Sequence, residues 1–482
     1  MTAKCVMVLG TTSGAGKSWL TTALCRHYAR QGLKVAPFKA QNMSNNARVV
    51  SGGEIGSAQY FQALAARAVP EVRMNPLLLK PERDTHSQVI LLGQVSEDLS
   101  RMPWRGRSEH VWPQIVQALD ELRVENDVVV IEGAGSPAEI NLHDSDIVNM
   151  RVALHAQARC LLVTDIDRGG AFAHLYGTWA LLPEVERALI SGFVLNKFRG
   201  DATLLAPAPQ MLQELTAVPT VATLPMWWQH GLPEEDGLFD DRSVATGVVK
   251  KTIAVVAYPR ISNLDEFQSF KNVPGVRLVW ARSPADVAGA DWIILPGSKH
   301  TSGDLAWLRA QGLGSAIAAH AAKGGAVLGI CGGLQMLGEA LIDPHAIDGN
   351  GPGLGLLPLV TLFERDKTVR HRMGAFSTVV GPWAALSGVK VQGYEIHHGR
   401  TAQHPAMAAG GDVAQAVMPD GLAWQNDAGN VLGLYLHGLF EDPAALRALF
   451  GVAVPTLDSV FDGLADYVER HFEPGVLRAL AA

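Results

Sequence analysis

Cysteine is scarce in this sequence, with four residues in a chain of 482. The four stand far apart, at Cys5, Cys25, Cys160 and Cys331, and no two of them form the CxxC spacing of a structural zinc site. Thiols so few and so scattered exclude a disulfide framework. Any cysteine that matters for function is therefore expected to act alone.

Charge is also sparse, because Asp, Glu, Lys and Arg make up 18% of the chain, where about 25% is usual. The net charge is −7 and no basic run occurs, which argues against a nucleic-acid partner. No apolar run approaches the roughly 18 residues of a membrane span. The first residues lead directly into a glycine-rich loop without a signal-cleavage site, so we expect a cytoplasmic protein. The sequence leaves open whether the chain forms a homo-oligomer.

Apolar residues are abundant, at 48% of the chain, and so is glycine, with 49 residues. Short β-branched runs that end at glycine-rich loops alternate with helical stretches, a pattern that predicts an α/β fold with parallel sheets. The predicted strands are residues 5–9, 34–38, 127–131, 160–164, 190–196, 252–257, 277–281, 292–295 and 326–330. The acidic, glycine-punctuated stretch 227–251 separates them into two series. We predict domains at 1–226 and 252–447, a linker between them, and a helical tail over 448–482.

A phosphate-binding loop follows the first predicted strand, with the sequence Gly10-Thr-Thr-Ser-Gly-Ala-Gly16-Lys17-Ser18 and a predicted helix after it. Backbone amides around Thr12, Gly14 and Gly16 are placed to surround phosphate oxygens of ATP, Lys17 to reach the outer phosphates, and Ser18 to hold Mg²⁺. Five residues separate Gly10 from Gly16, one more than in the strict motif. This longer form resembles the loop of dethiobiotin synthetase and its relatives, which phosphorylate a carboxylate or carbamate.

Polar residues at the ends of other strands are the candidates to complete that site, because ligands of open α/β sheets bind at the carboxyl ends of strands. Glu132 ends an almost wholly apolar strand and is predicted to bind Mg²⁺. Glu54 is a weaker candidate for the metal, and Asp146 for orienting a substrate. Lys39 is predicted to stabilise charge on a transferring phosphoryl group, and Asn196 to contact adenine.

A second motif, Gly329-Ile-Cys331-Gly332-Gly333, lies between a predicted strand and a helix. It has the form of a nucleophile elbow, in which a sharp turn exposes the thiol beside backbone amides. His437 follows an apolar strand about a hundred residues later and is the candidate base. Cysteine and histidine together suffice for nucleophilic acyl transfer.

These residues resemble the nucleophile and base of class I glutamine amidotransferases. The segment Leu-Pro-Gly297-Ser-Lys resembles the oxyanion loop of that family, which implies that Gly297 and Gly332 stabilise an oxyanion. The family's triad ends in a glutamate two residues after the histidine, where this chain has Leu439. This departure indicates the cobyrinic/cobyric subgroup, which works with a cysteine–histidine pair. Whether Glu395 or Glu441 orients the histidine stays open.

Further segments resemble the cobyric branch of this subgroup over nearly the whole chain except the tail. They are residues 38–44, 75–81, 87–90, 132–141, 165–170, 196–201, 258–263 and 435–440. The resemblance implies a dethiobiotin-synthetase-like ATP domain followed by a flavodoxin-like glutamine amidotransferase domain. It also implies ATP-, Mg²⁺- and glutamine-dependent amidation of the b, d, e and g carboxylates of a corrinoid, adenosylcobyrinic acid a,c-diamide, in cobalamin biosynthesis. Because that corrinoid is anionic, Arg168, Arg199 and Lys80 are candidate substrate contacts.

Three alternatives remain at this stage. The same two domains and the same chemistry would serve a cobyrinic acid a,c-diamide synthase, which amidates the a and c carboxylates. A nucleotide-dependent switch shares a related phosphate loop but leaves Cys331 and His437 without a role. A degenerate amidotransferase domain would bind a partner and hydrolyse no glutamine.

Overall fold

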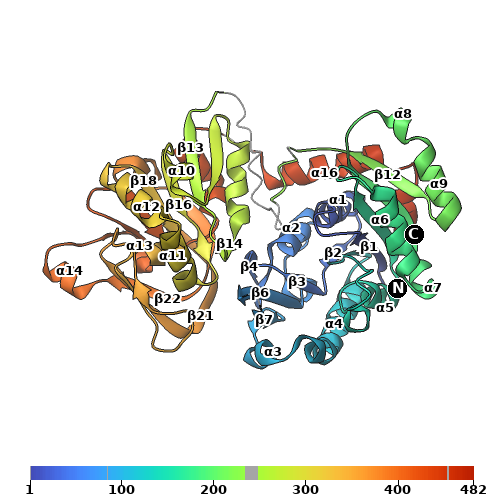
Figure 1. Cartoon of the computed structure of the whole chain (residues 1–482), viewed down its shortest axis with the longest axis horizontal. Coiled ribbons are helices and arrows are strands. Elements are labelled where there is room, and N and C mark those ends of the chain that lie inside the picture. Colours follow the sequence, from blue (N-terminus) through green and yellow to red (C-terminus); the bar gives the residue numbers. More distant parts are fainter. Residues whose placement is uncertain (1, 84, 229, 234–247, 453–454) are drawn as a thin grey trace.

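A six-stranded parallel sheet forms the centre of the N-terminal half (Figure 1). The computed structural model describes residues 2–83, 85–228, 230–233, 248–452 and 455–482. In spatial order the strands are β12 (Thr220–Pro225), β11 (Ile190–Phe198), β10 (Arg159–Asp165), β1 (Lys4–Gly10), β9 (Val128–Glu132) and β2 (Val35–Phe38). The predicted α/β class is confirmed, and each predicted strand is present with its ends within two residues of the expected positions.

Alternation along the strands explains why helices cover both faces of this sheet. Val6 and Val8 of β1 belong to one hydrophobic core, while Met7 and Leu9 belong to another on the opposite face. Strands that are buried on both faces are apolar throughout, as these are. The main helices of the two faces are α1 (Lys17–Arg30) and α2 (Ser57–Ala65) on one, and α4 (Trp104–Glu125), α5 (Met150–Ala156) and α6 (Ala171–Leu181) on the other.

The C-terminal half contains a second sheet, with seven strands and a single large core. Its order is β15 (Val276–Ala281), β13 (Lys251–Val256), β16 (Trp292–Leu295), β18 (Ala326–Ile330), β25 (Val431–Leu434), β24 (Ala423–Gln425) and β23 (Gln415–Met418). The first five strands run parallel, and the last two join antiparallel. Helices α11 (Thr301–Ala310), α12 (Leu313–Ala322) and α13 (Gly332–Leu337) connect or flank these strands.

Smaller strands, which the sequence did not predict, join the two halves. On the N-terminal side they are β3 (Gln41–Met43), β4 (Ala47–Val50), β5 (Gly53–Gly56), β6 (Leu77–Arg83), β7 (His86–Leu91) and β8 (Gln94–Val95). On the C-terminal side a long hairpin, β21 (Leu359–Ala375) and β22 (Lys390–Gln403), contacts β4. Ala47, Leu78 and Ile90 pack together with Ile396 across this contact. The two halves therefore meet through strands that belong to neither of the two main sheets.

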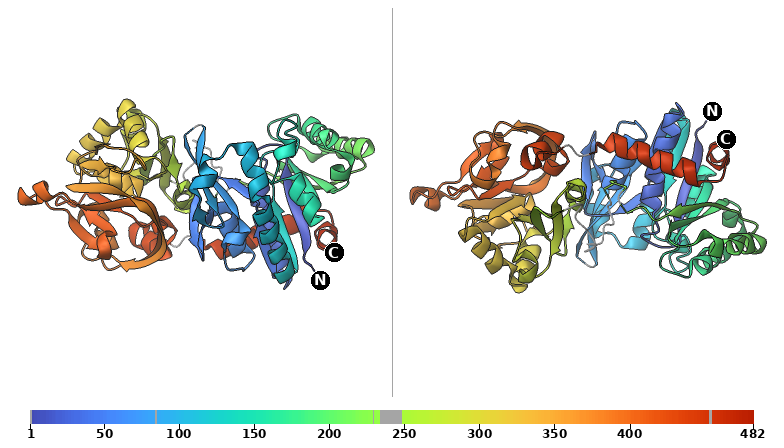
Figure 2. Two further views of the ribbon diagram at one scale, coloured as in Figure 1. Left: turned by 90° about the horizontal axis from the view of Figure 1, so that it is seen from below. Right: turned by 90° about the horizontal axis from the view of Figure 1, so that it is seen from above.

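The C-terminal segment returns to the N-terminal half, where α16 (Leu457–His471) lies along α1 (Figures 1 and 2). Phe461, Leu464 and Val468 are buried in the same core as α1 and α2. Ion pairs link α1 to α16, among them His27–Glu469 at 2.8 Å and Arg30–Asp466 at 2.5 Å. The segment predicted as a tail, 448–482, thus contributes a helix to the N-terminal core.

The predicted linker, 227–251, falls between β12 and β13, and residues 229 and 234–247 of it lie outside the described residues. The division into domains at this stretch stays a prediction.

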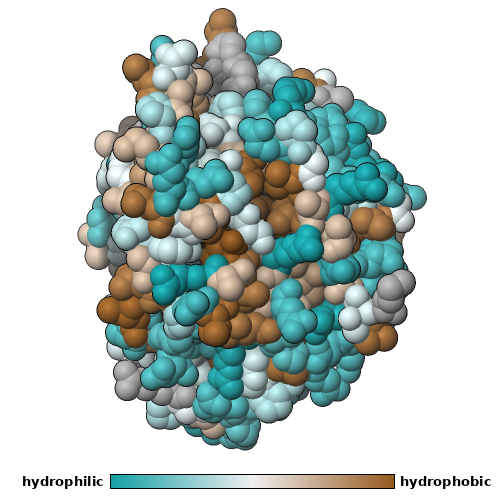
Figure 3. Space-filling model, turned by 90° about the vertical axis from the view of Figure 1, so that its right-hand side faces the viewer, coloured by the Kyte–Doolittle hydropathy of each residue, from teal (hydrophilic) through white to brown (hydrophobic). Residues whose placement is uncertain are grey.

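The surface at the far end of the N-terminal half mixes apolar and polar side chains (Figure 3). Exposed apolar residues occur on α7 (Glu184–Arg187), α8 (Ala202–Leu205) and α9 (Pro207–Thr216), namely Val185, Leu204, Met211 and Leu215. Within the described ranges, none of the helices combines the length and the apolar character that crossing a membrane requires.

Candidate active sites

The phosphate loop connects β1 to α1 and is shaped by left-handed glycines. Gly14 and Gly16 have φ angles of 72° and 103°. A Cβ at Gly16 would lie 2.1 Å from Asn196 Nδ2, so only glycine fits there. Lys17 Nζ donates to the carbonyl oxygens of Thr12 at 3.0 Å and Gly135 at 3.1 Å, which folds the lysine over the loop. The loop thus has the curvature and the cation that a polyphosphate requires.

Glu132, at the end of β9, is the buried carboxylate of this site. Its Oε1 accepts hydrogen bonds from Ser18 Oγ and Lys39 Nζ, each at 2.8 Å. Gln62 Nε2 donates to Oε2. Burial raises the pKa of Glu132, but Lys39 and the hydrogen bonds outweigh burial and hold it below the usual value, so the group is ionised. The structure therefore brings Lys17, Ser18, Lys39 and Glu132 together as predicted, and adds Gln62 of α2.

Asn196 and its neighbours support the loop from β11. Asn196 Nδ2 donates to the carbonyl of Ala15 at 2.9 Å, and Lys197 Nζ donates to the carbonyl of Gly14 at 2.8 Å. Both side chains thus contact the phosphate loop itself. The predicted adenine contact of Asn196 stays a prediction.

The two arginines predicted to meet substrate are exposed, and one of them lies beside the phosphate loop. Arg168 pairs with Asp165 at 3.4 Å, and a Cβ at Gly14 would lie 3.8 Å from its guanidinium. Arg199 pairs with Asp167. Neither side chain is buried, and the substrate contacts of both stay a prediction.

Glu54 and Asp146 make other contacts. Glu54 is buried between Lys80 and Lys367, at 2.5 Å from Lys80 Nζ, and these two lysines pair with its two carboxylate oxygens. Burial raises the pKa of Glu54, but the two lysines outweigh burial and hold it at about 2. Asp146 accepts hydrogen bonds from the backbone amides of Val148, Asn149 and Met150 at the start of α5. The structure does not bring either carboxylate to the Ser18–Glu132 pair.

Cys331 forms a sharp turn between β18 and α13. Its φ and ψ are 53° and −106°, a positive φ that is uncommon outside glycine and typical of a strained nucleophile elbow. The thiol lies 3.5 Å from the carbonyl oxygen of Ile396. Cys5, Cys25 and Cys160 lie inside β1, α1 and β10, where burial raises the pKa of each thiol. Cys331 is the cysteine placed for chemistry.

His437 lies three residues beyond β25 and is held between an acid and the thiol. Its Nδ1 is 3.2 Å from Glu266 Oε1, and the amide of the next residue, Gly438, donates to Glu266 Oε2 at 2.8 Å. Burial lowers the pKa of His437, but Glu266 and a hydrogen-bonded Cys331 outweigh burial and raise it to about 10. The imidazole ring therefore holds a proton at neutral pH.

The carboxylate that contacts His437 is Glu266, and not Glu395 or Glu441, the two candidates from the sequence. Glu395 pairs with Arg370, Arg372 and His397, and Glu441 pairs with Arg48. These carboxylates therefore have partners other than His437. Glu266 lies in η3 (Leu264–Asn272), 171 residues before its partner. The available signal was the Asp265-Glu266 pair, which lies between Leu264 and Phe267 just after segment 258–263.

The predicted oxyanion glycines converge on the same place. Gly297 lies in β17 (Gly297–Ser298), and a Cβ there would lie 2.9 Å from His437 Cε1. A Cβ on Gly332 would lie 2.8 Å from the backbone nitrogen of Ser298. Asp304 accepts a 2.6 Å hydrogen bond from the Ser298 hydroxyl and fixes this loop. Gly297 therefore lies beside His437, and Gly332, which follows Cys331, lies beside Ser298; the stabilisation of an oxyanion by these residues stays a prediction.

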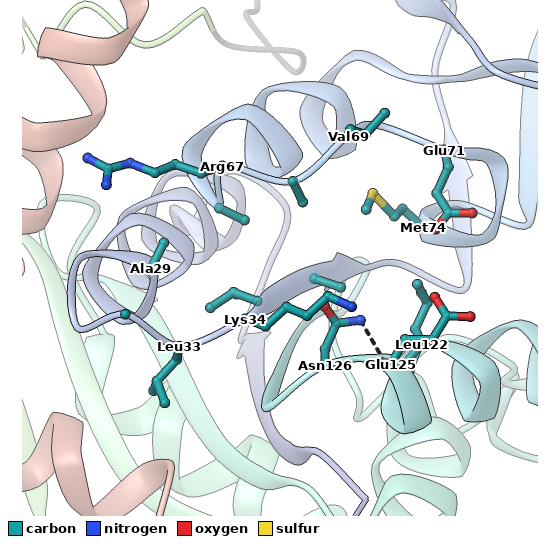
Figure 4. Close-up of a pocket in the computed structure, with 15 residues that line it drawn as sticks. Ala29, Leu33, Lys34, Arg67, Val69, Glu71, Met74, Leu122, Glu125 and Asn126 are labelled. Atoms are coloured by element: carbon teal, nitrogen blue, oxygen red, sulfur yellow. Dashed lines mark hydrogen bonds between the residues drawn. The ribbon is translucent and has the colours of Figure 1, made fainter.

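A cavity of about 480 Å³ lies at the opposite end of the N-terminal sheet, beside the start of β2 (Figure 4). Its walls include Lys34, Arg67, Glu71 and Glu125, none of which belongs to either site. The chemistry is expected at the loops of the carboxyl strand ends, which lie elsewhere.

Each half of the chain matches a known domain family. Residues 6–231 match the model of the CobQ/CobB/MinD/ParA nucleotide binding domain, and residues 252–445 match that of the CobB/CobQ-like glutamine amidotransferase domain. The chain is 80% identical to cobyric acid synthases of Polaromonas naphthalenivorans (strain CJ2) and Variovorax paradoxus (strain S110), over 100% of both chains in each case. The chain belongs to the cobyric acid synthase family. A further member of the cobyric acid synthase family, from Leptothrix cholodnii, is 66% identical over 99% of this chain and 97% of its own.

Two solved structures also match parts of this cobyric acid synthase family member. A glutamine amidotransferase crystal structure has 17% identity and a TM-score of 0.32, and covers 42% of this chain and 99% of its own. PurLQS from Thermotoga maritima has 22% identity and a TM-score of 0.31, and covers 46% of this chain and 100% of its own.

Proposed function

We propose that this chain has the activity for which its relatives are named, that of a cobyric acid synthase. It uses ATP and glutamine to amidate the b, d, e and g carboxylates of adenosylcobyrinic acid a,c-diamide, and the product is adenosylcobyric acid. The observation that carries the proposal is the presence of two complementary sites in one chain. One holds Ser18 beside the ionised Glu132 at a phosphate loop, and the other holds Cys331 beside His437 and Glu266.

At the glutaminase site, Cys331 attacks the side-chain amide carbon of glutamine and the carbonyl oxygen becomes an oxyanion. Amides near Gly297 and Gly332 stabilise that charge. The protonated His437 gives its proton to the leaving nitrogen, and ammonia departs. Water then hydrolyses the thioester to glutamate, with His437 acting as base. Glu266 keeps the imidazole oriented throughout, through its contact with Nδ1.

At the synthetase site, a corrinoid carboxylate attacks the γ-phosphorus of ATP, and an acyl phosphate and ADP form. Lys17 and Lys39 lie at the phosphate loop, where their charge stabilises the transferring phosphoryl group. Ammonia then attacks the acyl carbon and inorganic phosphate leaves. Arg168, exposed beside the loop, and Arg199, exposed at its pair with Asp167, are suited to bind other carboxylates of the same corrinoid.

Magnesium is the metal that the donor set fits. Ser18 Oγ and Glu132 Oε1 are hard oxygen donors that lie 2.8 Å apart at the phosphate loop. Among the described residues, no group of three or more His, Cys, Asp and Glu side chains is arranged to hold a metal. One carboxylate and one hydroxyl match the way Mg²⁺ binds with nucleotide phosphates. Ser18 and Glu132 would hold the ion, which neutralises phosphate charge when it is bound.

Separating the two half-reactions tests this proposal. Cys331→Ala is expected to abolish glutamine hydrolysis and glutamine-dependent amidation, while ammonium chloride still supports amidation. Lys17→Met is the matched variant, and it is expected to lose amidation from either nitrogen source and to keep glutamine hydrolysis. Chromatography of glutamate and of the corrinoid product measures both activities. A wild-type chain that hydrolyses no glutamine, or a Cys331→Ala variant that still does, contradicts the proposal.

A further inference from the structure

Arg48 belongs to the N-terminal half, in β4, but its charged end lies among residues of the C-terminal half. Its side chain is 3% exposed. The guanidinium donates to both carboxylate oxygens of Glu441, at 2.6 and 2.5 Å, and to Asp265. The same group lies over the ring of Tyr394, 5.2 Å from its centroid. Arg48 thus binds three different segments of the other half.

Each of those segments holds the glutaminase machinery. Asp265 directly precedes Glu266, the residue that contacts His437 Nδ1. Glu441 ends η6 (Leu439–Glu441), the turn that follows His437. The ring of Tyr394 stacks on that of His437, with centroids 5.4 Å apart, and the two backbones exchange hydrogen bonds of 2.9 and 3.2 Å. One arginine therefore contacts the ring that stacks on His437, the residue before Glu266 and the turn that follows His437.

The positive charge of Arg48 also compensates the carboxylates that are gathered near His437. Asp265 and Glu266 are fully buried and Glu441 is partly exposed, so carboxylates gather in a region with little water. Burying carboxylates costs free energy unless a cation and hydrogen bonds compensate them. Arg48 supplies that compensation with a planar, bidentate group that a lysine does not reproduce.

We propose that Arg48 is a positioning residue of the glutaminase, supplied by the ATP-binding half of the chain. It fixes Asp265, Glu441 and Tyr394, and through them the alignment of Glu266 with His437. The inference rests on the proposed function, because it assumes that Cys331 and His437 hydrolyse glutamine. It follows that the glutaminase site is complete only when the two halves are docked.

The segment that carries Arg48 also reaches the other active site. The β4–β5 hairpin leads into α2, where Phe61 lies under the guanidinium, 4.9 Å from ring centroid to Cζ. The next residue, Gln62, donates to Glu132 Oε2 beside the phosphate loop. A single short stretch of chain thus contacts the ATP-site carboxylate at one end and the neighbours of His437 at the other.

Kinetics of the full-length protein tests the proposal with Arg48→Met and Arg48→Lys. Misalignment of a catalytic group lowers the turnover rate more than substrate binding, so we expect Arg48→Met to lower the kcat of glutamine hydrolysis about 10- to 100-fold, with KM for glutamine unchanged. Arg48→Lys keeps the charge and loses the bidentate contact, so an intermediate kcat is expected. Amidation from ammonium chloride is expected to stay at the wild-type rate in both variants.

Lys367→Gln is the control, because it breaks another ion pair between the halves, Lys367–Glu54, without touching Asp265, Glu441 or Tyr394. Its kcat for glutamine hydrolysis is expected to match the wild type. An unchanged kcat in Arg48→Met overturns the inference. So does a loss that is equal in ammonia-dependent amidation, or equal in Lys367→Gln, since either result indicates a general effect on folding or docking. A wild type without glutaminase activity overturns the proposed function itself.

Discussion

At the scale of single residues, the protonation of His437 determines how the glutaminase works. An imidazole buried to 1% exposure would ordinarily lose its proton, because burial disfavours the charged form. Glu266 and Cys331 reverse that preference and raise the pKa of His437 to about 10. The proton that the leaving ammonia needs is therefore already in place at neutral pH.

Replacing Glu266 with glutamine tests this electrostatic argument. The imidazolium of the wild type persists as the pH rises until it passes about 10, so activity that needs the proton is expected to decline only there. Glu266→Gln removes the anion, which lowers the pKa of His437 and moves the alkaline decline to lower pH. The kcat for glutamine hydrolysis is expected to fall by about 100-fold or more. Steady-state rates of glutamate release from pH 6 to 10.5 measure both effects.

Glu395→Gln is the matched control for that experiment, because Glu395 binds His397 and two arginines rather than His437. Its alkaline decline is expected at the wild-type pH. An unshifted decline in Glu266→Gln would contradict the assigned role.

Residues that belong to a local sequence motif could be found from the sequence. Residues whose partners are distant in the chain could not. Cys331 lies in a glycine-rich turn between a strand and a helix, and Lys17 begins a helix directly after such a turn, so neighbouring residues reveal both. Glu266 meets His437 across 171 residues, through a short η3 segment with no periodic pattern. Glu54 was a reasonable metal candidate by type, but its lysine partners come from distant strands.

At the scale of elements, α16 contributes to the N-terminal core from the far end of the chain. Phe461, Leu464 and Val468 face α1 and the sheet, and ion pairs run along the edge of the contact. Helix α1 begins directly at the phosphate loop. The docking of α16 therefore supports the element that positions Lys17 and Ser18.

Phe461→Ala is expected to destabilise the N-terminal half by about 3–5 kcal/mol, because it removes a large buried ring from a packed core. Hydrogen exchange resolved along the chain is the measurement, with faster exchange expected in α1 and β1 and no change in β13 and β18. Asp466→Asn, which breaks the partly exposed pair with Arg30, is the control and is expected to cost about 0–1 kcal/mol. Equal acceleration in both halves, or none in α1, would contradict the packing described.

The elements that the sequence revealed were continuous apolar runs that end at polar or glycine-rich loops. Strands β1, β9 and β10 are apolar on both faces and end at polar loops, so their positions were predicted to within a residue at each end. The connecting strands β3 to β8 are short and polar in part, and their pairing depends on partners elsewhere in the fold. A helical tail was predicted over 448–482, and α16 lies within it, but the sequence of one helix does not say which core will receive it.

At the scale of the whole molecule, the chain is two catalytic halves joined by strand segments and buried ion pairs. The thiol of Cys331 lies beside Ile396, whose side chain packs against Ala47, Leu78 and Ile90 of the other half. Ammonia made at the first site thus originates next to the interface. That placement supports a division of labour in which one half makes ammonia and the other activates the carboxylate.

The central claim is that these two halves together amidate a corrinoid. The most direct measurement incubates the chain with ATP, Mg²⁺, glutamine and adenosylcobyrinic acid a,c-diamide and determines the product by mass spectrometry. We predict a product in which the b, d, e and g carboxylates have all become amides, formed with glutamine by the wild type and only with ammonia by Cys331→Ala. The absence of corrinoid amidation with either nitrogen source would contradict the account.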